Sequence, residues 1–437
     1  MTEGDMRFVA DARPAEHTDL TTDAPGVMCP SCRVTVPNGG AWVTWCDACD
    51  WNVSGGRQPE PKKGLRRVQA RIVTRAAERL HAEMVGHGSA GTGRVPMGAA
   101  FGAAVVISIV VLTGVVALAA CVIWAAAVAH AWWHWPLAVF CGLLLAALLP
   151  RPNPLRDDVL ELTREEAPHT WRLVDEVSDR LGLRPPAVLG FDPRFNAAVT
   201  RIGWRHRSTL IIGAPCWTLL DMQEKVALLG HELGHVRHGD TAWRVPVSAA
   251  STVLGRLQGL LQPDPVWSAR RGLGLFGPAV NALKWVLRMP VTGLLVLLSV
   301  ATARYGQRKE YHADLAAAGM AGPAAASSLL VRLLGLEGTT VRVAAAVRRG
   351  EGPWHTLGTS ARIPARERER LMRLGVRDGH RVDDTHPPTH LRLDLVSSVK
   401  PVVAPFSADH LAVGVERELA AVQVRLTRRV EDELRDA

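Results

Sequence analysis

The feature that most constrains the fold of this chain is a stretch of 56 residues, Val95 to Pro150, without Asp, Glu, Lys or Arg. A helix needs about 20 apolar residues to cross the hydrocarbon of a bilayer, so the stretch suits two crossings joined by a turn. The segment "AHAWWHWP" marks this turn: its tryptophans would lie at the headgroup level, and Pro136 would restart the chain. A buried hairpin in a soluble protein rarely reaches this length without a charge. The sequence therefore predicts a mainly α integral-membrane protein with a transmembrane helical hairpin over 95–150.

The distribution of Lys and Arg predicts the orientation of this hairpin. Eight of these residues lie between 62 and 94, Arg151 and Arg156 follow the second crossing, and the turn carries none. Because positive residues favour the cytoplasmic side, we expect a multi-pass protein of the cell membrane with its amino terminus and later domain in the cytoplasm. Residues 1–26 are acidic and lack an apolar run or a cleavage pattern. They are expected to be a disordered tail rather than a secretory signal.

A basic juxtamembrane helix and linker are predicted over 57–94. Within "KKGLRRVQARIVTRAAERL", apolar residues recur at helical spacing between basic ones: Leu65, Val68, Ile72, Ala76 and Leu80. Such a helix can lie on an anionic membrane surface, or it can be a solvated basic helix. The sequence leaves both interpretations open.

Two CxxC units, "CPSC" and "CDAC", separated by 13 residues, predict a small zinc ribbon over 27–56. Cys29, Cys32, Cys46 and Cys49 can surround one structural zinc ion tetrahedrally and leave no position for water. The spacing is slightly shorter than usual for a ribbon, so a chance pair of CxxC units is the alternative. The adjacent basic residues make nucleic acid conceivable, but no aromatic and basic platform supports it, and we expect no nucleic-acid partner.

Residues 151–437 have the pattern of a globular domain with a small sheet. Segment 163–182 predicts an amphipathic helix that ends at Gly182, and 186–213 predicts short strands broken by turns. In "DMQE", Asp221 and Glu224 form a capping box at the start of the next helix. That helix contains "GHELGH", which places His231 and His235 one turn apart on the same face, as two ligands of one metal must be.

A catalytic metal needs a third ligand and a general base. Glu232 follows the first histidine, where a carboxylate can reach a metal-bound water. The continuation xxGxxH is excluded, because positions 238 and 241 are His and Thr. In "RKEYHADLAAAG", Glu310 can act as a ligand while Asp314, one turn later, orients a ligand. Considered separately, this pair would be a solvated helix face in most proteins.

With "FNAAV", "HELGHVRHGD", "EYHAD" and "THPPTHLR" in this order, the chain resembles the HtpX-like and CaaX prenyl protease group of integral-membrane zinc endopeptidases over roughly residues 100 to 395. The resemblance implies a helical gluzincin fold with a membrane hairpin before the catalytic domain. It implies three catalytic zinc ligands and further site residues: His231, His235 and Glu310 as ligands, Glu232 as the catalytic glutamate, Asn196 in the substrate cleft, and His386 and Arg392 near the active centre. We expect His386 or Arg392 to donate to the oxyanion of the transition state.

The chain departs from that family in three places. Leu391 stands where the family usually has an acidic residue, and the ribbon is an addition. Two further membrane segments, near 243–262 and 283–303, are interrupted by Arg256 and Arg288. An even number of crossings must separate the zinc ligands, but two crossings would put basic residues in the outer loop, against the usual trend. The resemblance favours two crossings, and helices along the membrane surface are the alternative.

These features predict a membrane-anchored zinc endopeptidase with one catalytic and one structural zinc. Its expected partners are the lipid bilayer and protein or peptide substrates. The resemblance implies quality control of damaged membrane proteins or processing of lipidated peptides, and we expect quality control on the cytoplasmic side. Two other functions fit parts of the sequence. One is a non-proteolytic membrane scaffold whose metal is structural, and the other is a membrane-tethered zinc-ribbon module for nucleic acid. The sequence determines neither the physiological substrate nor the oligomeric state.

Overall fold

The computed structural model describes residues 26–40, 42–55, 65–86, 98–127, 134–149, 154–203, 205–237, 244–264, 276–360, 363–378, 387–400 and 404–436. The predicted disordered tail lies outside these residues, apart from Gly26. The chain divides into two compact units. The first comprises residues 1–59 with 364–374, and the second comprises residues 60–363 with 375–437.

The first unit contains the ribbon and part of helix α12 (Ala365–Asp378). Strands β1 (Val27–Met28) and β2 (Thr35–Val36) pair antiparallel, and Cys29, Val36 and Cys46 form a small buried cluster. Residues 42–46, which lead into the second cysteine pair, form no strand, and the Gly39 N–H donates to the Thr44 hydroxyl at 2.9 Å. The grouping of residues 364–374 with the ribbon is not evident from the sequence.

Arginine side chains of α12 satisfy backbone carbonyls of the ribbon. Arg366 donates to the Trp45 carbonyl at 2.7 Å, Arg370 to that of Val53, and Arg373 to that of Asp47. The Arg366 and Arg373 guanidinium groups also lie 5.0 and 5.1 Å from the centre of the Trp45 ring. A ribbon of about 30 residues buries little apolar surface, so these contacts with α12 add to its stability.

The second unit is built on a four-stranded sheet with the order β3-β4-β6-β5. The strands are β3 (Leu160–Leu162), β4 (Val188–Asp192), β5 (Ala197–Ile202) and β6 (Arg207–Gly213). β4 and β6 are parallel, and the other two pairs are antiparallel. Because β5 comes last in the strand order, it is an edge strand. This sheet confirms the short strands predicted over 186–213.

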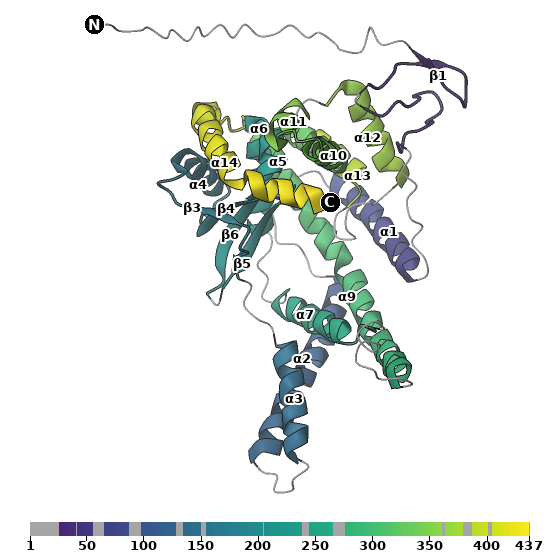
Figure 1. Cartoon of the computed structure of the whole chain (residues 1–437), viewed down its shortest axis with the longest axis vertical. Coiled ribbons are helices and arrows are strands. Elements are labelled where there is room, and N and C mark those ends of the chain that lie inside the picture. Colours follow the sequence, from purple (N-terminus) through teal and green to yellow (C-terminus); the bar gives the residue numbers. More distant parts are fainter. Residues whose placement is uncertain are drawn as a thin grey trace. The chain divides into compact units, whose positions relative to one another are not determined.

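Helices pack with this sheet around one core (Figure 1). The helices that contribute to it are α4 (Pro168–Arg180), α5 (Ala214–Leu219), α6 (Met222–Arg237), the end of α9 (Phe276–Ala321), α10 (Pro323–Arg348), α11 (Pro353–Ser360), α13 (Thr389–Ser398), the 3-10 turn Asp409–Leu411 and α14 (Ala412–Asp436). The amphipathic prediction for α4 is confirmed, because Trp171, Val174 and Val177 are buried on its inner face. Gly182 ends this segment with a φ of 68°, which favours glycine.

The long apolar helices of the second unit pack together. They are α2 (Ala99–Ala127), α3 (His134–Leu148), α7 (Arg244–Leu260) and the start of α9 (Phe276–Ala321). Phe101 of α2, Leu254 of α7 and Leu298 of α9 belong to one cluster. Much of α2 remains exposed despite its apolar character, including Val110, Val116 and Ile123. Such exposure is costly in water and suits lipid.

Among the described residues, α2 and α9 are long and apolar enough to cross a membrane. The predicted hairpin is therefore supported by its first arm, whereas α3 has 15 residues and spans about 22 Å, less than the ~30 Å of a hydrocarbon core. α3 begins two residues before Pro136, and most of the predicted turn lies outside the described residues. Of the two later segments, 283–303 lies within α9, whereas α7 has 17 residues and falls short of a crossing.

Candidate functional site

Helix α6 positions the two histidines of the candidate metal site. Its start is fixed by the predicted capping box: the Glu224 N–H donates to Asp221 Oδ1 at 2.8 Å, and the Asp221 N–H donates to Glu224 Oε2 at 2.9 Å. Leu229 and Leu233 are buried in the core on the other side of the helix, and Val236 is half-buried. Helical periodicity then places the His231 and His235 rings on one face, with their Nε2 atoms 3.2 Å apart.

Helix α9 brings Glu310 to the same place because two glycines of α6 allow it to approach closely. A Cβ on Gly230 would lie 3.1 Å from Ala317 Cα, and a Cβ on Gly234 would lie 3.0 Å from Ala316 Cβ. Each glycine directly precedes one histidine. The sequence reasoning missed these glycines, although the repeated Gly-His of "GHELGH" could have revealed a close helix contact.

The three candidate ligands form a triangle of the size that zinc requires. His235 Nε2 lies 3.5 Å from Glu310 Oε1, and His231 Nε2 lies 3.8 Å from Glu310 Oε2. Ligand atoms about 2.0–2.1 Å from a tetrahedral zinc are separated by roughly 3.3–3.4 Å, which agrees with the observed separations after small rotations of the carboxylate. The donor set therefore fits zinc, and it is borne by residues that are buried or half-buried.

A second layer of contacts orients the first histidine. Asp314 Oδ1 lies 3.1 Å from His231 Nδ1, so the carboxylate leaves Nε2 of that ring directed at the other ligands. Arg392 holds Asp314 through two hydrogen bonds of 2.7 Å, from Nε and Nη2. All three side chains are buried. Two donors of Arg392 are thus engaged with Asp314, which favours a positioning role over the expected transition-state donor.

The protonation of the histidines is governed by burial and by Asp314. Burial is the largest effect and lowers the pKa of His231, but the hydrogen bond to Asp314 and the negative charges of Asp314 and Glu232 together outweigh it, so the net shift is upward. For His235, burial lowers the pKa, the positive charge on His231 lowers it further, and the result is about 3. His235 is therefore neutral near pH 7 and can act as a ligand through a ring nitrogen.

The remaining predicted site residues differ in their burial, and one of them lies outside the described residues. Glu232 is half-buried beside His231, and its charge contributes to raising the pKa of that histidine. Asn196 is exposed immediately before the edge strand β5, which contacts α6, and its carbonyl accepts the Gly213 N–H at 2.6 Å. His386 lies outside the described residues, whereas the adjacent Pro387 and Pro388 are buried.

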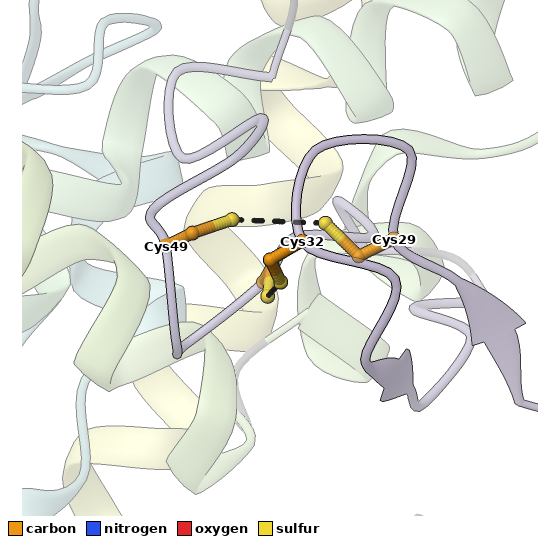
Figure 2. Close-up of side chains that lie close together, drawn as sticks. Cys29, Cys32 and Cys49 are labelled. Carbon is orange, nitrogen blue, oxygen red and sulfur yellow. Dashed lines mark hydrogen bonds between the residues drawn. The ribbon is translucent and has the colours of Figure 1, made fainter.

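The four cysteines form a second metal-ligating group, in the first unit. Cys29 Sγ lies 3.7 Å from Cys49 Sγ, and Cys32 Sγ lies 3.5 Å from Cys46 Sγ. Figure 2 shows the Cys29 and Cys49 side chains pointing toward one another. Sulfur atoms 2.3 Å from a tetrahedral zinc are separated by about 3.8 Å, so the group fits a zinc site made of four cysteines. Burial raises the pKa of the Cys29 thiol, but hydrogen bonds from backbone N–H groups of Cys32 and Ser31 and from the thiols of Cys32 and Cys49 together lower it. A backbone hydrogen bond lowers the pKa of Cys32, but its hydrogen bonds to the other three thiols and its burial outweigh this, so the net shift is upward.

Comparison with known proteins agrees with the first metal site. The sequence pattern of Peptidase family M48 matches residues 171–400, which include α6, α9 and α13. This is more than half of the chain. The chain belongs to peptidase family M48. Members of the family depend on zinc, so the family explains the convergence of His231, His235 and Glu310.

Three HtpX proteases illustrate how far the similarity to M48 relatives extends. The chain is 28% identical to the protease HtpX homolog of Tropheryma whipplei over 40% of its own length and 59% of that protein. Identity to the homolog of Acidiphilium cryptum is 31%, over 37% of this chain and 54% of that protein. For protease HtpX of Pseudomonas aeruginosa the values are 28%, 40% and 60%. The chain thus spans less than two thirds of these relatives.

Proposed function

We propose that this M48 chain is a membrane-anchored zinc endopeptidase that hydrolyses peptide bonds of membrane or membrane-associated proteins. The observation that carries the proposal is the meeting of three ligand atoms from α6 and α9, all within 4.8 Å of one another, with Glu232 beside them on α6. The names of the HtpX relatives support the same reaction class. The exposed apolar surface of α2 supports the membrane anchor.

The residues of the chain have distinct roles in this reaction. His231, His235 and Glu310 would hold the zinc ion, and Asp314 keeps the His231 ring in the orientation that ligation needs. A bound zinc ion would supply a Lewis acid and a water acidic enough to lose a proton near neutral pH. Glu232 would take that proton during attack and pass it to the leaving amine. The free edge of β5 beside α6 can hold the substrate as an added strand.

Substitution of Glu232 by Gln tests the reaction. The variant should bind zinc as the wild type does, because Glu232 is not a ligand, and should cleave a casein about 10²–10⁴ times more slowly, because the proton acceptor is lost. Glu161→Gln, an exposed position on β3, is the matched control and should keep full activity. Cleavage at the wild-type rate by Glu232→Gln would contradict the proposal and favour a scaffold with a structural metal.

The cytoplasmic side and the role in quality control are also proposals. The first is supported by the concentration of Lys and Arg on both sides of the 95–150 segment and the second by resemblance to HtpX proteases. Comparative proteomics of the membrane fraction, with Glu232→Gln as a trap for bound substrates, would test both. Enrichment of damaged membrane proteins with exposed cytoplasmic segments is the expected result. Enrichment of proteins that lack cytoplasmic segments would contradict the proposed side.

A further inference from the structure

Helix α1 (Leu65–Gly86) lies before the residues that match the family, yet it packs against two helices of the candidate zinc site. Its contacts are with α9 and α13. Neither interpretation left open by the sequence, a helix on the membrane surface or a solvated helix, describes the second half of α1. There Ala77 and Leu80 are fully buried, whereas Arg75 and Arg79 are exposed.

An apolar cluster joins the three helices. Leu80 of α1, Tyr311 of α9 and Leu395 of α13 form its buried centre. Leu391 packs against this cluster. The leucine at position 391, where related proteases usually have an acidic residue, thus has a physical explanation: a carboxylate there would lie against the apolar side chains of this cluster.

Polar contacts around the cluster fix the position of α1 along both helices. Glu83 Oε2 accepts a hydrogen bond from Arg304 at 2.7 Å and lies 3.4 Å from Arg308, both on α9. His81 Nε2 lies 3.1 Å from Asp394 Oδ2 on α13. Because polar side chains of α1 contact each helix, α1 connects the two helices to one another.

The same two helices share the buried ion pair that orients His231. On α9, Tyr311 directly follows Glu310, and Asp314 lies one turn from that ligand. On α13, Arg392 directly follows Leu391 and lies one turn before Leu395. The residues that contact α1 are therefore neighbours of both members of the pair, and the separation of α9 and α13 sets the geometry of the bonds between Arg392 and Asp314.

We propose that α1 braces the zinc centre and that Leu80 is a positioning residue: by holding α13 against α9, it keeps Arg392 on Asp314 and so keeps His231 aligned for zinc. The inference rests on the zinc site of the proposed function. It adds a role for a segment outside the residues that match the family, because α1 contacts the two helices whose residues orient a zinc ligand.

The test compares Leu80→Ala with Val85→Ala in the full chain, in detergent. Val85 is also on α1 but is exposed, so it is a matched control. Co²⁺ serves as the metal probe, because its spectrum distinguishes a histidine and carboxylate site from four thiolates. Leu80→Ala should weaken Co²⁺ binding at the histidine site about tenfold, as loss of outer contacts to a ligand does. It should lower kcat on a casein with little change in KM. Leu80→Met, which keeps an apolar side chain of similar volume, should keep the Co²⁺ affinity and the kcat of the wild type.

A second variant separates positioning from a general folding defect. Glu83 is 40% exposed, so Glu83→Gln leaves the core intact while it weakens the contact with Arg304 and Arg308. It should shift metal affinity and kcat in the same direction as Leu80→Ala, by a smaller factor. If Leu80→Ala and Glu83→Gln lower the melting temperature but leave Co²⁺ affinity and kcat at wild-type values, α1 is structural only and the brace is refuted. If the wild type itself binds no Co²⁺ at the histidines, the proposed zinc site fails first and the brace with it.

Discussion

At the scale of single residues, Gly234 decides whether α9 can reach the histidines. A Cβ at this position would lie 3.0 Å from Ala316 Cβ and 3.2 Å from Ala313 Cα, which is tighter than ordinary contact. Gly234→Ala should force α6 and α9 apart by a few tenths of an ångström. Overpacking costs ~1–3 kcal/mol, part of which is offset by the better helix propensity of alanine, so we expect a net loss of about 1 kcal/mol. Zinc affinity should fall as well, because Glu310 moves away from the histidines.

Gly319→Ala is the control for that substitution. Gly319 lies on α9, and a Cβ there would meet nothing within 4 Å. Alanine in an open helical position should raise stability by about 0.5–1 kcal/mol, measured by urea unfolding in detergent. Equal unfolding midpoints and equal zinc affinities for the two variants would show that close contact at Gly234 does not position Glu310.

At the scale of secondary structure, elements governed by local rules were predictable and those governed by distant contacts were not. The start of α6 was predictable, because the capping box of Asp221 and Glu224 acts within four residues. The continuity of α9 from the membrane segment to Glu310 was not, because Pro290 stands inside the helix and its residues change from apolar to polar along its length. The pairing of Asp314 with Arg392 joins positions 78 apart, and spacing within one helix does not predict such a contact.

The role of helix α12 depends on residues that are far from it in the sequence. Arg370 and Glu367 are both buried, form an ion pair of 2.7 Å, and Arg370 also donates to the Val53 carbonyl. Arg370→Met should leave the Glu367 carboxylate buried without its partner, which costs ~3–5 kcal/mol. We expect residues 42–55 to lose protection in hydrogen exchange, since α12 no longer satisfies the ribbon carbonyl.

Two further variants serve as controls for the test of α12. Arg368→Ala, an exposed position on the same helix, should leave the exchange of residues 42–55 unchanged. The double variant Glu367→Met with Arg370→Met removes both charges and should recover part of the stability, because no buried charge remains unpaired. Wild-type protection of the ribbon in Arg370→Met would show that the ribbon is held by its metal alone.

At the scale of the whole molecule, the chain carries two metal-ligating groups of different chemistry, one in each unit. Four thiolates would close the shell of a zinc ion, whereas two histidines and a glutamate would leave a position open for water. Both ligand sets were predictable from sequence motifs. The contacts that support them, α12 for the cysteines and α1 for the histidines, were not, because they join segments more than 200 residues apart.

Metal analysis of purified variants tests the independence of the two groups. The wild type should contain about two zinc ions per chain, one for each ligand set. Cys29→Ser with Cys32→Ser should lose one of them and keep the zinc of the histidine site, because no cysteine of the ribbon is among its ligands. Glu310→Ala should instead lose the zinc of the histidine site and keep the one bound to cysteine. A single zinc in the wild type that persists in the cysteine variant would mean that the four thiols bind none, and the ribbon would then depend on α12 for its stability.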